Sequence, residues 1–236
     1  MTLQGQDNPF MIGDLLVFCL VVVPVQIHSG LRLWNSSLGP LDLAVAALIS
    51  YMMVEPASGV LHVVLDNAKF NEWPLLGEVA ISFQKHHNMP IEISWRPTQN
   101  FFLEAMVPYA IIGSQALFIT NEFVVAVCFM LFFSTELMMF SHRWSHMANS
   151  RKPFIAKALQ KSGIIMSDAH HHDHHRTYDN NFAICAGWSN PLMNYLVKNH
   201  WDEDDMRWLG VFAGFYFLPI ALSSFNGEVQ WPVSPV

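Results

Sequence analysis

Eight of the chain's twelve histidines fall into four short clusters, and each cluster lies beside an apolar stretch. The eight are His62, His86, His87, His142, His146, His171, His174 and His175. Imidazole is a common protein ligand for iron, copper and zinc, and one ion cannot use eight imidazoles. A hydrolytic zinc site needs only about three protein ligands and a carboxylate base. The clusters therefore predict a site for two metal ions at the edge of a membrane.

The spacing within two clusters suggests how the imidazoles are shared. His142 and His146 lie four residues apart, so a helix presents both on one face to one ion. His86 and His87 are adjacent, and a helix turns them about 100° apart, so they can reach two different ions.

The helical period also shows which side chains share a face in the tract from His170 to His175. His171, His174 and His175 share one face of a helix, while His172 points elsewhere and is expected to be solvated. His170 precedes His174 by four residues and remains either a ligand or a support for one.

Carboxylates accompany the first cluster. Asp66 follows His62 by four residues and so shares its helical face. Glu55 precedes His62 by seven residues and lies near that face within an apolar stretch. A carboxylate in a membrane span faces the bundle interior, so Glu55 is either near the metals or in an interhelical hydrogen bond.

Composition places these clusters in a membrane protein. The 236 residues are 52% hydrophobic and only 13% charged, against about 25% charged in soluble domains. We expect one membrane-embedded domain over residues 1–236. The net charge of -7 and the absence of a basic tract exclude a nucleic-acid partner. Three widely spaced cysteines predict neither disulfides nor a thiolate site.

Five apolar stretches approach the roughly 20 residues that span a bilayer. They cover residues 10–27, 41–65, 101–119, 123–141 and 208–225. The third and fourth are joined only by residues 120–122, which predicts an antiparallel helical hairpin. The predicted fold is thus an all-α integral membrane protein with four to five transmembrane helices and a His-rich cap that holds a di-metal site.

The positions of the basic residues predict how the chain is oriented across the membrane. If residues 66–100 and 142–207 share one side, every Lys and Arg except Arg32 lies there. The positive-inside rule then puts the His face in the cytosol, or in the stroma of a plastid. Residues 1–9 carry no Lys or Arg, so they predict neither a secretory signal nor a transit peptide. The acidic run 202–205 predicts a solvated turn or a helix cap, and the tail after Asn226 an irregular segment.

Several ordered motifs together resemble the lipid desaturase family, the Kua-type proteins, which includes the plastid phosphatidylglycerol desaturase and plasmanylethanolamine desaturase. The resemblance covers about residues 41–194. It is carried by residues 59–67, 74–77, 83–90, 141–146, 159–160, 171–175, 180–182 and 187–191. The stretches 66–67, 83–84, 159–160 and 176–181 look more like the plastid member. Asp168 to His170 replace more basic residues there, which bears on headgroup contacts.

The resemblance implies a membrane-bound, O2-dependent, non-haem di-iron desaturase that acts on the chain of an intact glycerolipid. It assigns two Fe ions to the eight clustered histidines, a supporting role to Asp66 beside a ligand imidazole, and a water-mediated role to Asn190. No cytochrome or flavin domain is encoded, so an external electron-donor protein is implied. Ferredoxin is expected in a plastid thylakoid, which is favoured, and cytochrome b5 in the endoplasmic reticulum.

Other functions stay open at this point. The same site can serve a plasmanylethanolamine-type ether-lipid desaturase, or a hydroxylase, since desaturation and hydroxylation diverge only after the first hydrogen is removed. A non-catalytic accessory or pigment-binding subunit of a larger membrane complex is a further alternative. Axial ligands for pigments would be spread along the spans, however, and these histidines are packed in pairs and triples.

Overall fold

The computed structural model describes residues 9–73, 77–201 and 205–227, and all regular structure in these ranges is helical. This confirms the predicted all-α class. The expectations for residues 1–8, for Asp202 to Asp204 and for the tail from residue 228 lie outside the described residues. The α-helices are α1 (Pro9–Val17), α2 (Val23–Trp34), α3 (Pro40–Asp66), α4 (Gly77–Asn88), α5 (Glu92–Trp95), α6 (Thr98–Glu104), α7 (Met106–Gly113), α8 (Glu122–Ser145), α9 (Phe154–Ser162), α10 (Asp168–Thr177), α11 (Asn190–Asn199) and α12 (Arg207–Phe225).

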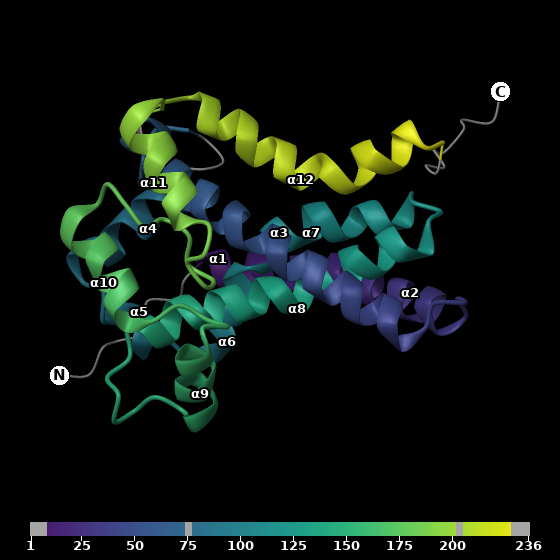
Figure 1. Ribbon diagram of the computed structural model, residues 1–236, viewed down its shortest axis with the longest axis horizontal. Coiled ribbons are helices and arrows are strands. Elements are labelled where there is room, and N and C mark those ends of the chain that lie inside the picture. The colour runs from purple at the N-terminus through teal and green to yellow at the C-terminus, as the bar shows by residue number, and fades with distance from the viewer. Residues whose placement is uncertain (1–8, 74–76, 202–204, 228–236) are drawn as a thin grey trace. The chain divides into compact units, whose positions relative to one another are not determined.

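Three helical stretches of the described chain are long and apolar enough to cross a bilayer: Gly13–Trp34, α3 and α8 (Figure 1). At 1.5 Å per residue, the 27 residues of α3 extend about 40 Å, more than the roughly 30 Å of a hydrocarbon core. A helix of that length that crosses the bilayer must project beyond it. The metal-ligand candidates His62 and Asp66 lie in its last turns.

The first stretch is continuous but locally widened. Phe18–Val22 forms a π-helical turn between α1 and α2. Pro24 follows directly, and proline has no N–H to donate to a carbonyl four residues earlier. The wider turn accommodates the missing hydrogen bond without ending the helix.

The expectation of one continuous span over residues 101–119 is wrong. The structure forms α6, α7 and the 3-10 turn Ser114–Leu117 instead, with the break at Ala105. Pro108 cannot donate to the carbonyl of Glu104, which removes a hydrogen bond across this break. Tyr109 of α7 still donates to the carbonyl of Cys128 in α8 (3.3 Å), so the two segments pack together as the short connection suggested.

The last apolar stretch forms α12, a 19-residue helix that contains Pro219. Asp205, the described end of the acidic run, accepts a hydrogen bond from the backbone N–H of Arg207 at 2.9 Å. An aspartate at this position satisfies a free N–H of the first helical turn. Asp205 therefore caps the helix, as one of the two expectations for this run proposed.

The chain folds as two compact units, and each can be described separately. One comprises residues 1–50, 97–135 and 216–236. Within it, Arg32 donates to the carbonyls of Ala116 and Ile119 and to the carboxylate of Glu122. The one basic residue expected on this side of the membrane thus closes the open carbonyl end of a helical segment.

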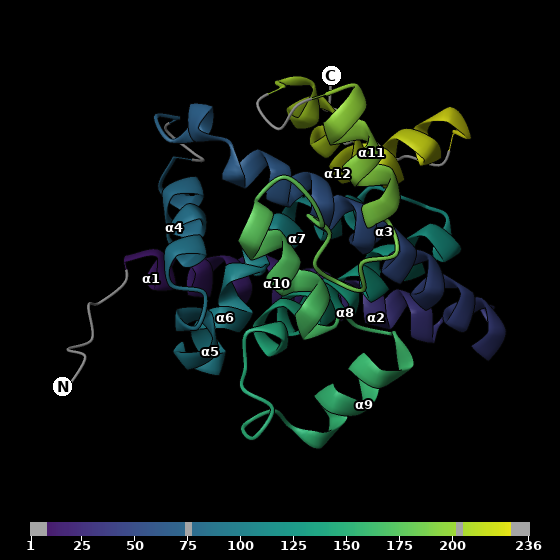
Figure 2. The same cartoon turned by 60° about the vertical axis from the view of Figure 1, so that its left-hand side comes forward.

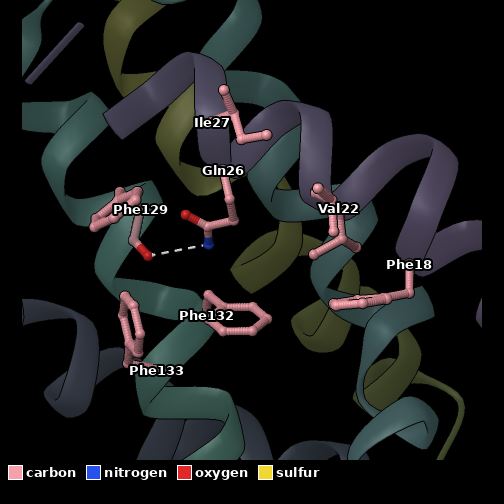
Figure 3. A pocket seen from close by; sticks show the side chains of 8 residues that line it. Phe18, Val22, Gln26, Ile27, Phe129, Phe132 and Phe133 are labelled. Atoms are coloured by element: carbon pink, nitrogen blue, oxygen red, sulfur yellow. Dashed lines mark hydrogen bonds between the residues drawn. The ribbon is translucent and has the colours of Figure 1, made fainter. Parts of the chain in front are cut away.

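This unit also holds an apolar cavity of about 230 Å³ (Figure 3). Its walls are Phe18, Val22, Val23, Gln26, Ile27, Phe129, Phe132 and Phe133. Gln26, the one polar residue in this wall, donates to the Tyr109 hydroxyl at 2.6 Å and to the Phe129 carbonyl at 3.4 Å. Its side-chain amide is therefore anchored within an otherwise apolar lining.

The other unit comprises residues 51–96 and 136–215 and contains all the histidine clusters. One of its apolar cores packs the last turns of α3 against Phe70, Phe182 and Trp208. From α3 this core takes Val60, Val63, Val64 and Leu65. The core therefore fixes the helix end that carries His62 and Asp66.

Candidate metal centre

Four helices bring the eight clustered histidines together. His62 comes from α3, His86 and His87 from α4, and His142 from the end of α8, where His146 follows directly; His171, His174 and His175 come from α10 (Figures 1 and 2). The ring of His171 lies 4.6 Å from that of His142 and 6.3 Å from that of His62, measured between centroids. Helix α10 is therefore the element that links the ends of α3 and α8.

The first ligand group contains five imidazoles: His86, His142, His146, His171 and His175. One nitrogen of each lies within 4.8 Å of those of all the others. The Nε2 atom of His171 is 2.8 Å from that of His146 and 3.0 Å from that of His175. Two neighbouring ligands at about 2.1 Å from one ion and 90° apart are about 3.0 Å from each other, so these spacings fit a shared ion.

The second ligand group contains His62, Asp66, His87 and His174. The Nε2 atom of His87 lies 3.1 Å from Oδ1 of Asp66, and those of His62 and His174 lie 3.4 and 3.6 Å from Oδ2. The carboxylate thus lies within 3.6 Å of all three imidazoles. Asp66 meets all three from the position of a fourth ligand, whereas the sequence suggested that it supports one imidazole.

The ligand atoms of this second group lack hydrogen-bond partners despite their proximity. Both oxygens of Asp66 and the Nε2 atoms of His62, His87 and His174 are buried and make no hydrogen bond. An unsatisfied buried polar group costs about 1–3 kcal/mol. Nitrogen and carboxylate donors converging in this way satisfy the preference of iron or zinc, so the residues fit a divalent metal.

Backbone carbonyls fix the rings of two ligands. His174 donates from Nδ1 to the carbonyl of Asn180 at 2.6 Å, and His86 donates from Nδ1 to the carbonyl of Phe83. A proton on Nδ1 leaves Nε2 with its lone pair directed to the metal. The structure thereby sets the tautomer of one ligand in each group.

Burial keeps four imidazoles of the first group neutral. Loss of solvation, followed by repulsion from neighbouring imidazoles, lowers the pKa of His146 to about 2, of His175 to about 2 and of His86 to about 3. The pKa of His171 is lowered by the same causes. At neutral pH these rings carry no proton that a metal would have to displace.

Adjacent histidines divide between the two groups, as the helical positions of His86 and His87 suggested for that pair only. His86 belongs to the first group and His87 to the second, while α10 gives His171 and His175 to the first group and His174 to the second. His172 is exposed and belongs to neither group.

Asn190 and His170 lie outside both groups. The side-chain amide of Asn190 donates to His170 Nε2 at 2.7 Å and to the Ala183 carbonyl at 3.0 Å, and its oxygen accepts from the Ala183 N–H at 2.7 Å. Both ends of the amide are therefore engaged. In this structure Asn190 holds the loop before α11 against α10, next to the ligand His171.

Glu55 supports the same loop from α3, a role that its position in the sequence did not reveal. Its fully buried carboxylate accepts from the N–H groups of Ala186 and Gly187, both at 2.7 Å, and from that of Ser189 at 3.3 Å. Ser58, one turn further along, accepts from the N–H of Ile184 at 3.1 Å. The face of α3 that carries His62 thus also holds residues 184–189.

A buried ion pair secures the start of α10. The ammonium of Lys152 lies 2.7 Å from Asp168 Oδ2 and 2.9 Å from the Gln160 side-chain oxygen. Gln160 also donates to Asp168 and to the carbonyl of Met166. Asp168 is the first residue of α10, where a carboxylate favours the helix dipole. The unusual Asp168 before the histidine tract therefore has a structural partner.

A polar cavity of about 230 Å³ opens beside the second ligand group. Its walls are Asp66, Gln84, His87, Asn88 and Tyr178. Tyr178 is exposed, stacks on the His87 ring at 5.1 Å and adopts a left-handed backbone (φ 63°) at the end of α10. This cavity gives water and small solutes a route to the second group.

The fold and the site together define a helical protein with apolar stretches long enough to span a bilayer and two groups of residues that could hold metal ions. Comparison with known proteins makes this class specific. The model of the lipid desaturase domain matches residues 51–203, more than half of the chain, and the chain belongs to that family. The matched range includes every residue of both ligand groups.

Named relatives fall in the same family. The chain is 31% identical over 159 residues to fatty acid desaturase 4, chloroplastic, of Arabidopsis thaliana, covering 64% of this chain and 48% of that protein. It is 28% identical to fatty acid desaturase 4-like 2 of the same plant (70% of this chain, 58% of the relative). It is 29% identical to the plasmanylethanolamine desaturase of Myxococcus xanthus (71% and 62%). The chain thus spans about half to three fifths of these relatives. No solved structure matches it significantly.

Proposed function

We propose that this protein is a membrane-bound di-iron desaturase that introduces a double bond into a hydrocarbon chain of a glycerolipid. The observation that carries the proposal is the convergence of eight imidazoles and one carboxylate into two ligand groups. Two bound irons would supply the oxidising power, with O2, two electrons and two protons converting a –CH2–CH2– unit to –CH=CH– and releasing two waters. The membership in the lipid desaturase family supports this reaction class.

The chain's own residues would prepare the site for this chemistry. The first group would hold one iron through five neutral imidazoles, and the second would hold the other through three imidazoles and Asp66. Asn180 and Phe83 orient ligand rings through their carbonyls, while Glu55 and Asn190 hold the loop against α3 and α10. Electrons would come from an external donor protein, ferredoxin or cytochrome b5.

We propose a phosphatidylglycerol-type acyl lipid as the substrate, in a plastid membrane. The name of the relative fatty acid desaturase 4, chloroplastic, supports this choice. The Myxococcus relative supports an ether-lipid chain as the second candidate. The two substrates differ in the linkage of the chain to glycerol, so product analysis separates them.

The test combines metal content with lipid analysis. The purified chain should contain about two irons, and cells that express it should gain a lipid that is two hydrogens lighter. His146→Ala and His174→Ala should each reduce the iron content and abolish the product. His172→Ala is the matched control, since its exposed ring belongs to neither group. A product heavier by one oxygen would instead indicate hydroxylation, and two irons with no product would favour an accessory subunit.

A further inference from the structure

Helix α9 presents an apolar and a basic surface that the metal site does not use. Phe154 and Ile155 at its start are 85% and 56% exposed. Lys157 and Lys161 are also exposed and form no ion pair with described residues. At 100° per residue the two lysines lie on one side of the helix, and the exposed apolar residues on the side next to it.

The opposite side of α9 is fixed to the protein. Ala156 is fully buried, and Gln160 is bonded to Lys152, Asp168 and the carbonyl of Met166. Ala156 and Gln160 are four residues apart and therefore share one face of α9. Helix α9 therefore has one face docked on its own unit and one face, bearing Phe154 and the two lysines, open to its surroundings.

A hydrogen bond holds the C-terminal end of α9 against the apolar part of α3. The hydroxyl of Tyr51 in α3 donates to the carbonyl of Ile164, two residues after α9 ends, at 2.8 Å. Tyr51 precedes His62 by eleven residues, which is about 16 Å along the helix. It belongs to the apolar span of α3. The end of α9 thus lies alongside a membrane-spanning helix, on the membrane side of the metal centre.

We infer that α9 is an interfacial helix that inserts Phe154 and Ile155 into the bilayer and binds anionic lipid headgroups through Lys157 and Lys161. Aromatic and aliphatic side chains next to lysines are the composition of helices that lie in a membrane surface. Each lysine near an anionic surface strengthens binding severalfold. An acidic protein is a less suitable partner, because it would leave the exposed Phe154 and Ile155 beside a charged surface.

The experiment measures lipid selectivity on the full chain and does not depend on desaturation. The detergent-purified protein is incubated with equal amounts of phosphatidylglycerol and phosphatidylcholine of matched chains and repurified, and the retained lipids are counted by mass spectrometry. We expect the wild-type protein to favour phosphatidylglycerol by roughly tenfold at low salt. The preference should fall at least threefold in K157Q/K161Q and in 0.5 M salt, since salt screens exposed charges.

Two further variants separate the effect of the α9 lysines from that of other lysines and from that of the apolar residues of α9. K85Q/K198Q removes two exposed lysines of the same unit outside α9 and should keep the wild-type preference. F154S/I155S should lower retention of both lipids while leaving their ratio unchanged. Circular dichroism and the thermal midpoint confirm that each variant is folded.

The proposal is overturned if K157Q/K161Q retains the wild-type lipid ratio or if both double lysine variants lose it equally. An unchanged ratio together with weaker binding of ferredoxin, an acidic protein, would assign the surface to a protein partner. Because iron content and product formation are separate readouts, loss of the desaturase proposal would leave this result intact.

Discussion

At the scale of single residues, Asp66 is the position where the structure changes the interpretation most. The motif places it one turn after His62 and suggests support for a ligand. The structure instead puts its two oxygens 3.1–3.6 Å from three imidazoles, with no hydrogen bond to any of them. A carboxylate surrounded by imidazole nitrogens is an arrangement that a shared cation stabilises.

We therefore predict that Asp66→Asn loses one metal ion. The amide is a much weaker ligand than the carboxylate, so the second group should empty while the five-histidine group keeps its ion. Iron content should fall from about two to about one per chain, measured by elemental analysis of purified protein. Glu92→Gln is the control, because Glu92 pairs with Arg96 outside both groups. Two irons in Asp66→Asn would restrict Asp66 to a supporting role.

The lowered pKa values of the buried imidazoles predict a pH dependence for the metal-free protein. The unfolded chain takes up protons on these rings below about pH 6.5, whereas the folded chain does not until about pH 2–3. Stability must therefore fall as the pH drops through this window, by up to about 1.4 kcal/mol per pH unit for each such ring.

Thermal unfolding of the metal-free chain in detergent, between pH 7.5 and 5, tests this expectation. The midpoint should decrease steadily below about pH 6.5. His146→Ala should reduce the slope of the midpoint against pH. A midpoint independent of pH would show that the folded imidazoles are protonated as easily as the unfolded ones.

At the scale of elements, one face of α3 performs two tasks. His62 and Asp66 supply ligands, while Glu55 and Ser58 bind the backbone of residues 184–189. The loop in turn presents Asn190 to His170, next to a ligand on α10. Alignment of α3 and α10 is thus maintained by a carboxylate that lies outside both ligand groups.

We predict that Glu55→Ala destabilises the protein by roughly 3 kcal/mol, since it leaves backbone N–H groups of the loop buried and unpaired. The thermal midpoint in detergent should fall by roughly 5–10 °C. Glu55→Gln, which keeps one oxygen acceptor, should have a smaller effect. Glu92→Ala removes an exposed carboxylate of the same unit and should be nearly neutral. An unaltered midpoint in Glu55→Ala would mean that other contacts suffice to hold the loop.

At the scale of the whole molecule, helix length decides how the chain can lie in a membrane. Helix α3 is unbroken from Pro40 to Asp66 and is longer than the hydrocarbon core is thick. If it crosses the bilayer, the loop before Pro40 and the histidine clusters lie on opposite sides. The distribution of Lys and Arg predicts that the clusters face the cytosol or the stroma.

Cysteine labelling in sealed vesicles tests this topology. In a background with Cys19 replaced by serine, Ser36→Cys and His172→Cys should react with a membrane-impermeant maleimide from opposite sides. Both positions lie outside the apolar spans, and His172 is exposed. Labelling of both from one side would show that α3 does not cross the membrane.

Much of the fold class and of the candidate site could be predicted because the signals are local. Apolar runs near 20 residues indicate spans, and the separations of four between His142 and His146 or His171 and His175 indicate shared helical faces. The same reasoning failed at residues 101–119, where hydropathy records apolar character but not the broken hydrogen bonding around Ala105. Asp205 was expected to form a turn or a cap, and only coordinates choose between them.

By itself the sequence determined which side chains are suited to bind metal and that His62 and His142 lie near the ends of apolar helices, since both depend on residue type and helical period. The tertiary structure decided how those side chains are divided. Helix α10 gives ligands to both groups, Asp66 enters the second group, and Glu55 binds amides 131–134 residues away. Such distant pairings depend on how helices cross, and helix crossing is set by packing of the whole unit, which no local spacing encodes.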